Sequence, residues 1–383
     1  MSAFRYTFYA QEVIFGPGSI AQLRETSERF GWHRIMLCTT AHARSRGHVT
    51  AVEDALGERL VASYEGVRPH VQDIQVAEAL ALAAEYQVDA LIGLGGGSAI
   101  GMAKAASFEL AEQQSNTART TITTGRPPIP TVAIPTTYAG SEMTPVFGVT
   151  RQIDGAPRKV TVTDARVAPR LTIYDPLLTV DLPPHITAST GINAVAHCIE
   201  ALYSITRNPL SSAAALAGLR AMGQALPRCY TVGDDLEART EMLTGAFLAG
   251  TALANVAMGL HHGICHVLGG TAGVAHGEAN SVMLPHVMRF NLDATAPQLA
   301  QAAGAMGIPL AGQSAEAAAT EATQQVADWV RDMRLPQRLY DVGVREADLP
   351  VLAQLAFASR TVQNNPKAIG DVAQMEELLR QAW

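Results

Sequence analysis

The chain has 383 residues, of which 48% are hydrophobic and 16% charged, so it can build two folded domains and is unlike a disordered segment. Its 28 Lys and Arg residues against 35 Asp and Glu residues give a net charge of −7. No basic run occurs, which argues against nucleic-acid binding through a phosphate-tracking surface. The four cysteines are widely spaced and form no CxxC pair, which excludes a disulfide scaffold or zinc knuckle and favours a reducing compartment.

We expect neither a targeting segment in these residues nor a segment that crosses a membrane. The first residues, MSAFRYTFYAQEVIFG, lack the apolar stretch of a signal peptide. The most apolar stretches carry Gly, Lys or His within about 18 residues, so none is expected to span a bilayer. We therefore expect a cytoplasmic protein with neither a membrane nor a nucleic acid as its partner.

The first half alternates between helical and strand-like segments, which predicts an α/β domain with a parallel sheet over residues 1–180. The expected elements are a helix over 19–30, a strand over 34–39, a helix over 71–86, a strand over 88–93, a helix over 99–112 and a strand over 131–134. The strands are short and apolar, as is typical of strands buried on both faces. The polar residues 109–126 are expected to form a surface excursion.

The second half has almost no strand signal from about Asp181 onward. Long runs rich in Ala, Leu, Met and Gly predict buried helices instead. The expected helices cover residues 188–204, 211–229, 236–268 and 315–333. Pro and Asp cluster in residues 174–184 and mark the boundary. We therefore expect an all-helical domain over residues 181–383.

A glycine loop, Gly95-Gly96-Gly97-Ser98, follows a predicted strand and opens a predicted helix. Glycines let backbone N–H groups approach a pyrophosphate, and the start of a helix adds partial positive charge. Ser98 can cap the helix or donate to a phosphate. The loop matches neither GxGxxG nor the Walker pattern, and a tight turn that needs positive φ is the alternative. We predict that it binds the phosphates of a dinucleotide.

A second polar loop carries Thr136, Thr137, Tyr138 and Ser141 after another predicted strand. Ligands of open α/β sheets bind at the carboxyl ends of the strands, so we expect both loops to lie at one edge. We assign Thr136, Thr137 and Ser141 to cofactor binding; an ordinary Thr/Ser turn is the alternative. Thr40 stands near the end of another strand, where an NAD-specific acid often lies. Without that carboxylate, both NADH and NADPH are expected to bind.

Histidines gather in the helical half. Asn193 and His197 are four residues apart, as are His262 and His266, so each pair shares a helix face. A buried imidazole needs partners, and four imidazoles on three segments, His276 included, are expected to line one pocket rather than lie singly in the core. Imidazoles can donate protons and stabilise an oxyanion near neutral pH. Three histidines with a carboxylate would suit Zn²⁺ or Fe²⁺, but Asn193 is neutral, which should weaken metal binding.

Glu200 follows His197 by three residues. It is either an orienting group for the pocket or a solvated carboxylate on the helix surface.

These motifs resemble the iron-containing alcohol dehydrogenase superfamily across nearly the whole chain. The matching segments are residues 15–18, the two loops, and residues 174–176, 191–200, 259–270, 276–280 and 284–286. The resemblance implies an N-terminal α/β dinucleotide-binding domain with a parallel sheet, followed by an all-helical catalytic domain.

Within the superfamily the chain is most similar to the maleylacetate reductase branch. Gly101 stands where metal-dependent relatives usually carry Asp, the loop over 135–145 lacks their Gly-Thr-Gly-Ser-Glu run, and Asn193 replaces an Asp ligand. The family's other metal positions fall on His197, His262 and His276, which with Asn193 would hold a metal if one is present. Reductases of this branch are regarded as working without metal, so we expect none.

The resemblance implies an oxidoreductase that reduces the C=C bond of maleylacetate to 3-oxoadipate with NADH or NADPH, in the degradation of aromatic compounds. His266 and His197 are expected to donate to the developing oxyanion or supply the proton. His262 and His276 are expected to shape and polarise the pocket.

Three further assignments concern the substrate and the cofactor. Tyr138 and Asn193 are assigned to substrate. Lys159 is a candidate for a substrate carboxylate or, from its family position, for the nicotinamide ribose, and is assigned to the cofactor.

Two other functions remain open at this point. One is a metal-dependent alcohol dehydrogenase, in which Fe²⁺ or Zn²⁺ polarises a carbonyl. The other is a dinucleotide-binding module without catalysis. Apolar helical surface, the resemblance and the frequency of twofold assemblies favour a homodimer.

Overall fold

The structure is a computed structural model that describes residues 4–117, 127–153 and 156–383; the side chains of 113–117, 152–153 and 156–159 are not described. It divides into two compact units. One unit is Phe8–Asp181 and the other is Leu182–Trp383, with the residues up to Thr7 grouped with the second. The backbone N–H of Thr7 donates to Oδ1 of Asn255 in that second unit at 2.9 Å.

The unit Phe8–Asp181 contains a six-stranded sheet of order β1-β8-β5-β4-β2-β3, in which every pair is parallel. Its strands are β1 (Glu12–Phe15), β2 (Ile35–Cys38), β3 (Leu60–Tyr64), β4 (Ala90–Gly95), β5 (Thr131–Pro135) and β8 (Leu171–Tyr174). The parallel sheet predicted from the sequence is confirmed. Strands β2, β4 and β5 correspond to the three predicted strands, with β4 displaced by two residues, whereas β1, β3 and β8 were not predicted.

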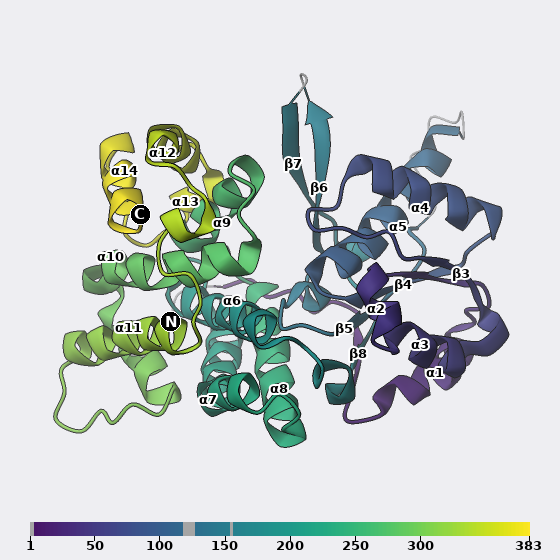
Figure 1. Cartoon of the computed structure of the whole chain (residues 1–383), viewed down its shortest axis with the longest axis horizontal. Coiled ribbons are helices and arrows are strands. Elements are labelled where there is room, and N and C mark those ends of the chain that lie inside the picture. Colours follow the sequence, from purple (N-terminus) through teal and green to yellow (C-terminus); the bar gives the residue numbers. More distant parts are fainter. Residues whose placement is uncertain (1–3, 118–126, 154–155) are drawn as a thin grey trace. The chain divides into compact units, whose positions relative to one another are not determined.

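Helices cover both faces of this sheet (Figure 1). They are α1 (Leu23–Phe30), α2 (Ala41–Ser45), α3 (His48–Leu56), α4 (Asp73–Glu85) and α5 (Gly97–Thr117), with 3-10 turns η1 (Ser19–Gln22), η2 (Gly57–Arg59), η3 (Ser141–Met143), η4 (Ala165–Val167) and η5 (Pro176–Thr179). Helix α5 continues into the polar segment 109–126, so the predicted surface excursion begins as helix; residues 118–126 lie outside the described residues.

Strand β2 shows why the sheet is apolar throughout. Its side chains alternate between two cores: Ile35 and Leu37 pack with α1 and α3, and Met36 and Cys38 pack with α4 and α5. A strand covered on both faces needs an apolar residue at every position, which explains the short apolar runs in the sequence.

A separate antiparallel hairpin, β6 (Val146–Ile153) with β7 (Ala156–Thr163), lies apart from the main sheet (Figure 1). Phe147 and Val149 on β6 pack into the core shared with α4 and α5. The sequence did not predict this hairpin, because its apolar residues are interrupted by Thr, Arg and Lys.

The second unit is helical, as predicted: its described residues contain no strand. Its helices are α6 (Pro184–Tyr203), α7 (Pro209–Thr231), α8 (Leu236–Leu253), α9 (Leu260–Thr271), α10 (His276–Ala305), α11 (Ala315–Asp332), α12 (Leu349–Phe357), α13 (Arg360–Gln363) and α14 (Val372–Gln381), with 3-10 turns η6 (Tyr340–Val342) and η7 (Glu346–Asp348). The prediction of a single helix over 236–268 is wrong, because the helical structure is interrupted between α8 and α9. Among the described helices, none is long and apolar enough to cross a bilayer.

Candidate active site

Three helices of the second unit bring the predicted histidines together. Helix α6 carries Asn193 and His197, α9 carries His262 and His266, and α10 begins at His276. The ring centroids of His197 and His262 are 4.6 Å apart, with an interplanar angle of 13°. We call His197, His262, His266 and His276 the histidine cluster.

The outer rings of the cluster are slightly further apart. His276 lies 6.0 Å from both His262 and His266, and His262 lies 6.3 Å from His266, between ring centroids. His197 and His262 are 4% and 3% exposed, His276 is half-buried and His266 is exposed. The cluster therefore runs from the core of the helical unit to its surface, with Asn193 buried on the same helix as His197.

Glu200, left between two interpretations by the sequence, is buried against the cluster. Its carboxylate lies 2.5 Å from Nδ1 of His262. It also accepts the backbone N–H groups of Gly259, His261 and His262 at 3.1, 3.2 and 3.2 Å. These donors lie at the start of α9, where a negative charge is favoured by the helix dipole. A solvated surface carboxylate is ruled out, and the contact with His262 agrees with the interpretation as an orienting group.

This hydrogen bond assigns one proton of His262. The carboxylate already accepts three backbone N–H groups and accepts a fourth hydrogen bond from the N–H at Nδ1. The proton of the neutral ring is therefore on Nδ1, and Nε2 carries the lone pair. Nε2 of His262 and Nδ1 of His197 are buried without a hydrogen-bond partner among the described residues. The hydrogen-bonding capacity of both nitrogens is therefore unused among these residues.

Burial sets the charge of the inner histidines. It lowers the pKa of His197 and of His262 well below 6.5, and repulsion between neighbouring imidazoles adds to the effect. Burial raises the pKa of Glu200, whereas His261 and the backbone N–H groups act in the opposite direction. The two inner imidazoles are therefore neutral at pH 7.

A catalytic metal needs ligand lone pairs that converge on one point, and a charged ligand among them strengthens its binding. The rings of His197 and His262 lie face to face. Asn193 supplies a neutral amide, and within the described part of the chain no three His, Cys, Asp or Glu side chains have a metal-binding arrangement. The neutral amide of Asn193 would weaken the binding of a metal here without excluding it.

Glycines let α9 and α10 approach their neighbours, a requirement that the sequence analysis missed. A Cβ on Gly263 would lie 2.5 Å from Cγ2 of Val362, and a Cβ on Gly277 would lie 2.8 Å from Cβ of Ser189. Both contacts are closer than atoms tolerate, so these positions accept only glycine without rearrangement. The contact of Gly277 thereby sets the distance between α10 and α6, which both carry histidines, and that of Gly263 sets the distance between α9 and α13.

In the α/β unit, the predicted cofactor residues lie at the carboxyl ends of neighbouring strands. Thr40, the glycine loop Gly95–Ser98 and the pair Thr136–Thr137 follow β2, β4 and β5, which are adjacent. We call this edge the dinucleotide edge. The N–H of Thr136 donates to the carbonyl of Gly95 at 3.0 Å, which joins the two loops.

Glycine occurs at two positions of this loop for different structural reasons. Gly95 has φ +137°, which favours glycine, so the alternative of a turn with positive φ holds at this position. Gly96 allows close approach, because a Cβ there would lie 3.2 Å from Oγ1 of Thr137 and would require that side chain to shift. The loop surface beside Thr137 is thus bare backbone, which is what a phosphate cradle requires.

Other predicted residues are placed less directly. Ser141 begins the turn η3, and the side chain of Tyr138 is fully buried. A fully buried phenol has no surface for a substrate, so its position does not support the predicted carboxylate contact. Lys159 pairs with Thr150 in the hairpin, and its side chain lies outside the described residues.

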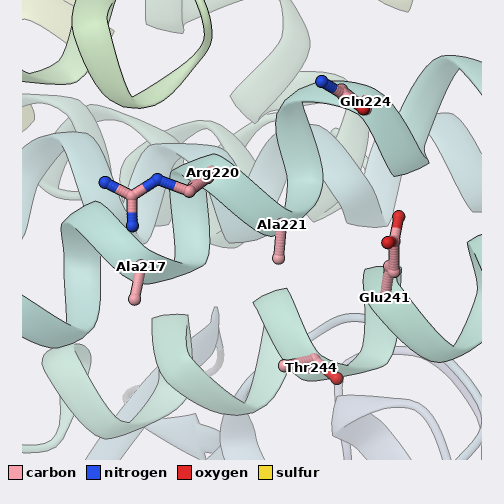
Figure 2. A pocket seen from close by; sticks show the side chains of 6 residues that line it. All are labelled: Ala217, Arg220, Ala221, Gln224, Glu241 and Thr244. Atoms are coloured by element: carbon pink, nitrogen blue, oxygen red, sulfur yellow. The ribbon is translucent and has the colours of Figure 1, made fainter.

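A hollow of about 340 Å³ lies at α7 and α8. Figure 2 shows its lining, which is Ala217, Arg220, Ala221, Gln224, Glu241 and Thr244. None of the predicted site residues lines it, so it is separate from the histidine cluster.

Comparison with known families agrees with this architecture. Residues 10–176 match the model of the iron-containing alcohol dehydrogenase, and residues 187–383 match that of the Fe-containing alcohol dehydrogenase family, C-terminal. The chain therefore belongs to the iron-containing alcohol dehydrogenase family and is an oxidoreductase.

Individual members of the family are similar to this chain over nearly its whole length. A maleylacetate reductase of Pseudomonas knackmussii is 36% identical over 380 residues, which cover 99% of this chain and 97% of that relative. The crystal structure of a maleylacetate reductase from Agrobacterium tumefaciens has a TM-score of 0.84 at 32% identity, covering 100% of this chain and 99% of the other. A 1,3-propanediol oxidoreductase has a TM-score of 0.91 at 32% identity, covering 100% of both chains. The fold alone thus does not separate these activities.

Proposed function

We propose that this protein is a maleylacetate reductase, which transfers hydride from NADH or NADPH to the C=C bond of maleylacetate and forms 3-oxoadipate. The observation that carries the proposal is the histidine cluster on three helices, of which α6 also carries the neutral Asn193. Full-length similarity to maleylacetate reductases supports it.

The reaction needs negative charge to be stabilised on one oxygen. The double bond of maleylacetate is conjugated with a ketone. Hydride adds to the alkene carbon β to the ketone, and the electron pair moves to the ketone oxygen as an enolate. A proton is then added to the carbon next to the ketone, so one NAD(P)H and one proton are consumed per product.

The protonation states of the histidines indicate which of them can donate to the enolate oxygen. His197 and His266 are the proposed donors to the enolate oxygen, and one such donor is typically worth about 3–4 kcal/mol. His262 donates its Nδ1 proton to Glu200, so its Nε2 is an acceptor; this supports the assignment of His262, with His276, to shaping and polarising the pocket. His266 is the exposed member, which supports its role in renewing the proton from solvent.

The proposal extends to the absence of a required metal. Asn193 is predicted to contact substrate through its amide instead of holding a cation. The lack of charge on this amide supports the assignment, because a carboxylate would bind a cation more strongly. A metal-dependent alcohol dehydrogenase is the alternative that the experiment must exclude.

The dinucleotide edge is the proposed cofactor site, with Gly95–Ser98 at the phosphates and Thr136, Thr137 and Ser141 opposite them. Thr40 places no carboxylate beside the ribose, which supports the use of both NADH and NADPH. The assignment of Lys159 to the cofactor, the homodimer and the cytoplasmic location remain predictions from the sequence.

The test is an assay of NADH and NADPH oxidation with maleylacetate, with the product identified by mass spectrometry. A parallel assay offers NAD⁺ and NADP⁺ with 1,3-propanediol. The proposal predicts 3-oxoadipate in the first assay and no turnover in the second. Oxidation of the diol without reduction of maleylacetate would contradict it, and cofactor binding without any turnover would favour a binding module.

A further inference from the structure

A lysine is buried beneath the dinucleotide edge. Lys104 lies on α5, seven residues after Gly97 and therefore near the same side of the helix. Its side chain is 0% exposed. Its Nζ donates to the backbone carbonyl oxygens of Ser141, Thr144 and Val146 at 2.5, 2.7 and 3.1 Å. All three protons of the ammonium group are used to hold one stretch of chain.

That stretch is also held from the other side. The hydroxyl of Tyr174, on β8, donates to Oε1 of Glu142 at 2.9 Å. Nε2 of Gln11 donates to the backbone carbonyl of Glu142 at 2.7 Å. The turn η3 is therefore fixed between α5 and β8.

The held segment borders the glycine loop. A Cβ on Gly97 would lie 3.7 Å from Cβ of Ala139 and 3.9 Å from Cβ of Ser141. Thr136 and Thr137 begin the same loop, and the backbone of Thr136 is bonded to Gly95. Moving residues 141–146 away from α5 would thus move the wall opposite the glycines.

Burial of this lysine is unfavourable in itself. Burial lowers the pKa of Lys104 to about 7, and the nearby Glu142 raises this pKa and so offsets part of the shift. A methionine would fill the same space without a buried charge, which is often neutral or stabilising. The three carbonyl contacts are what the lysine adds.

We propose that Lys104 is a positioning residue of the cofactor site, which holds the Thr136–Val146 loop against the glycine loop at the width that a dinucleotide needs. The proposal rests on the proposed function, because it takes the dinucleotide edge as the NAD(P)H site. It assigns to Lys104 an effect on cofactor affinity and none on the chemistry in the helical unit.

The test compares Lys104→Met, which removes all donors, with Lys104→Gln, which keeps two. Lys367→Met is the matched control, since Lys367 pairs with Asp293 at the surface of the helical unit. The dissociation constant of NADH is measured by fluorescence titration, and kcat at saturating NADH and maleylacetate. We expect the constant to rise about tenfold or more in Lys104→Met, less in Lys104→Gln and not in Lys367→Met, because bonds from a charged donor are lost. We expect kcat to stay within about threefold, because catalysis depends on other residues.

The possible results distinguish failure of the proposed function from failure of the proposed role of Lys104. If the wild type binds neither NADH nor NADPH, the proposed function fails. If the wild type binds and folded Lys104→Met binds equally well, or loses kcat with unchanged affinity, the role of Lys104 is overturned. If both variants fail to fold by circular dichroism, Lys104 supports the whole unit and not this loop, which also overturns the proposal.

Discussion

The carboxylate of Glu200 lies 2.5 Å from Nδ1 of His262 and also accepts three backbone N–H groups at the start of α9. The side chain of Glu200 therefore caps the start of α9, which carries His262 and His266. The same side chain selects the tautomer of His262. The Nε2 lone pair of His262 follows from the same contact that stabilises the fold.

Exchanging Glu200 for Gln separates these two effects. The amide group would place a donor opposite Nδ1 of His262, which must then accept, so the proton moves to Nε2. We expect kcat with maleylacetate to fall about tenfold or more, as is common when such an orienting partner is changed, while the dissociation constant of NADH stays the same. Steady-state kinetics and fluorescence titration measure both. Wild-type kcat in a folded Glu200→Gln protein would contradict this role of Glu200.

Glu200→Ala is the companion variant. It removes the acceptor of the three N–H groups, and leaving buried donors unpaired costs about 1–3 kcal/mol each before water or rearrangement compensates. We expect a clear loss in the free energy of unfolding, larger than that of Glu200→Gln, in urea titrations. Equal stabilities of the two variants would mean that the helix start does not depend on this acceptor.

The close packing of α9 makes a second prediction. Gly263→Ala would place a Cβ 2.5 Å from Cγ2 of Val362, and overpacking of this kind typically lowers the free energy of unfolding by about 1–3 kcal/mol. Adding Val362→Ala should recover part of the loss. Gly101→Ala is the control: its Cβ would lie 3.9 Å from Val71, and Ala in a helix is about 0.5–1 kcal/mol better than Gly. Equal urea midpoints for Gly263→Ala and Gly101→Ala would refute the contact.

Much of this arrangement could be predicted from the sequence. The apolar runs indicated β2, β4 and β5, and their alternation with helical segments indicated a parallel sheet, because strands covered on both faces are apolar at every position. The spacing of four residues paired His262 with His266 on one helix face. Each of these signals is local, and local periodicity is what a single sequence records best.

Other features depend on contacts distant in sequence. Glu200 meets the start of α9 about 60 residues further along the chain, and nothing near Glu200 indicates that contact. Helix α10 was not predicted because Pro285 and Pro297 lie inside it, and both usually end a helix. Lys104 appeared only as one residue of an Ala-rich helix, and its carbonyl partners became visible only with the turn η3.

Stability should depend on pH through Lys104. The pKa of this lysine is about 7 in the folded protein and 10.5 in the unfolded chain. Between these values the unfolded state binds more protons, so the free energy of unfolding gains up to about 1.4 kcal/mol per pH unit from this group. The difference in unfolding free energy between wild type and Lys104→Met should therefore rise with pH across this window and be flat below it. A difference that is independent of pH would contradict the shifted pKa.

A carboxylate at position 193 should recruit a metal. Asn193→Asp adds the negative charge that the cluster lacks, so we expect higher affinity for Zn²⁺ or Fe²⁺ than in the wild type, measured by calorimetry and by metal content after dialysis. Asn193→Ala is the control and should gain no affinity. Unchanged metal affinity in Asn193→Asp would mean that the rings of the cluster cannot converge on an ion.

The central claim is that imidazoles, not a cation, stabilise the enolate formed during reduction of maleylacetate. The most direct measurement is NADH oxidation with maleylacetate by protein treated with chelator, with its metal content determined on the same sample. The account predicts full turnover at far less than one metal ion per chain. Loss of turnover on chelation, restored by one equivalent of Fe²⁺ or Zn²⁺, would contradict it.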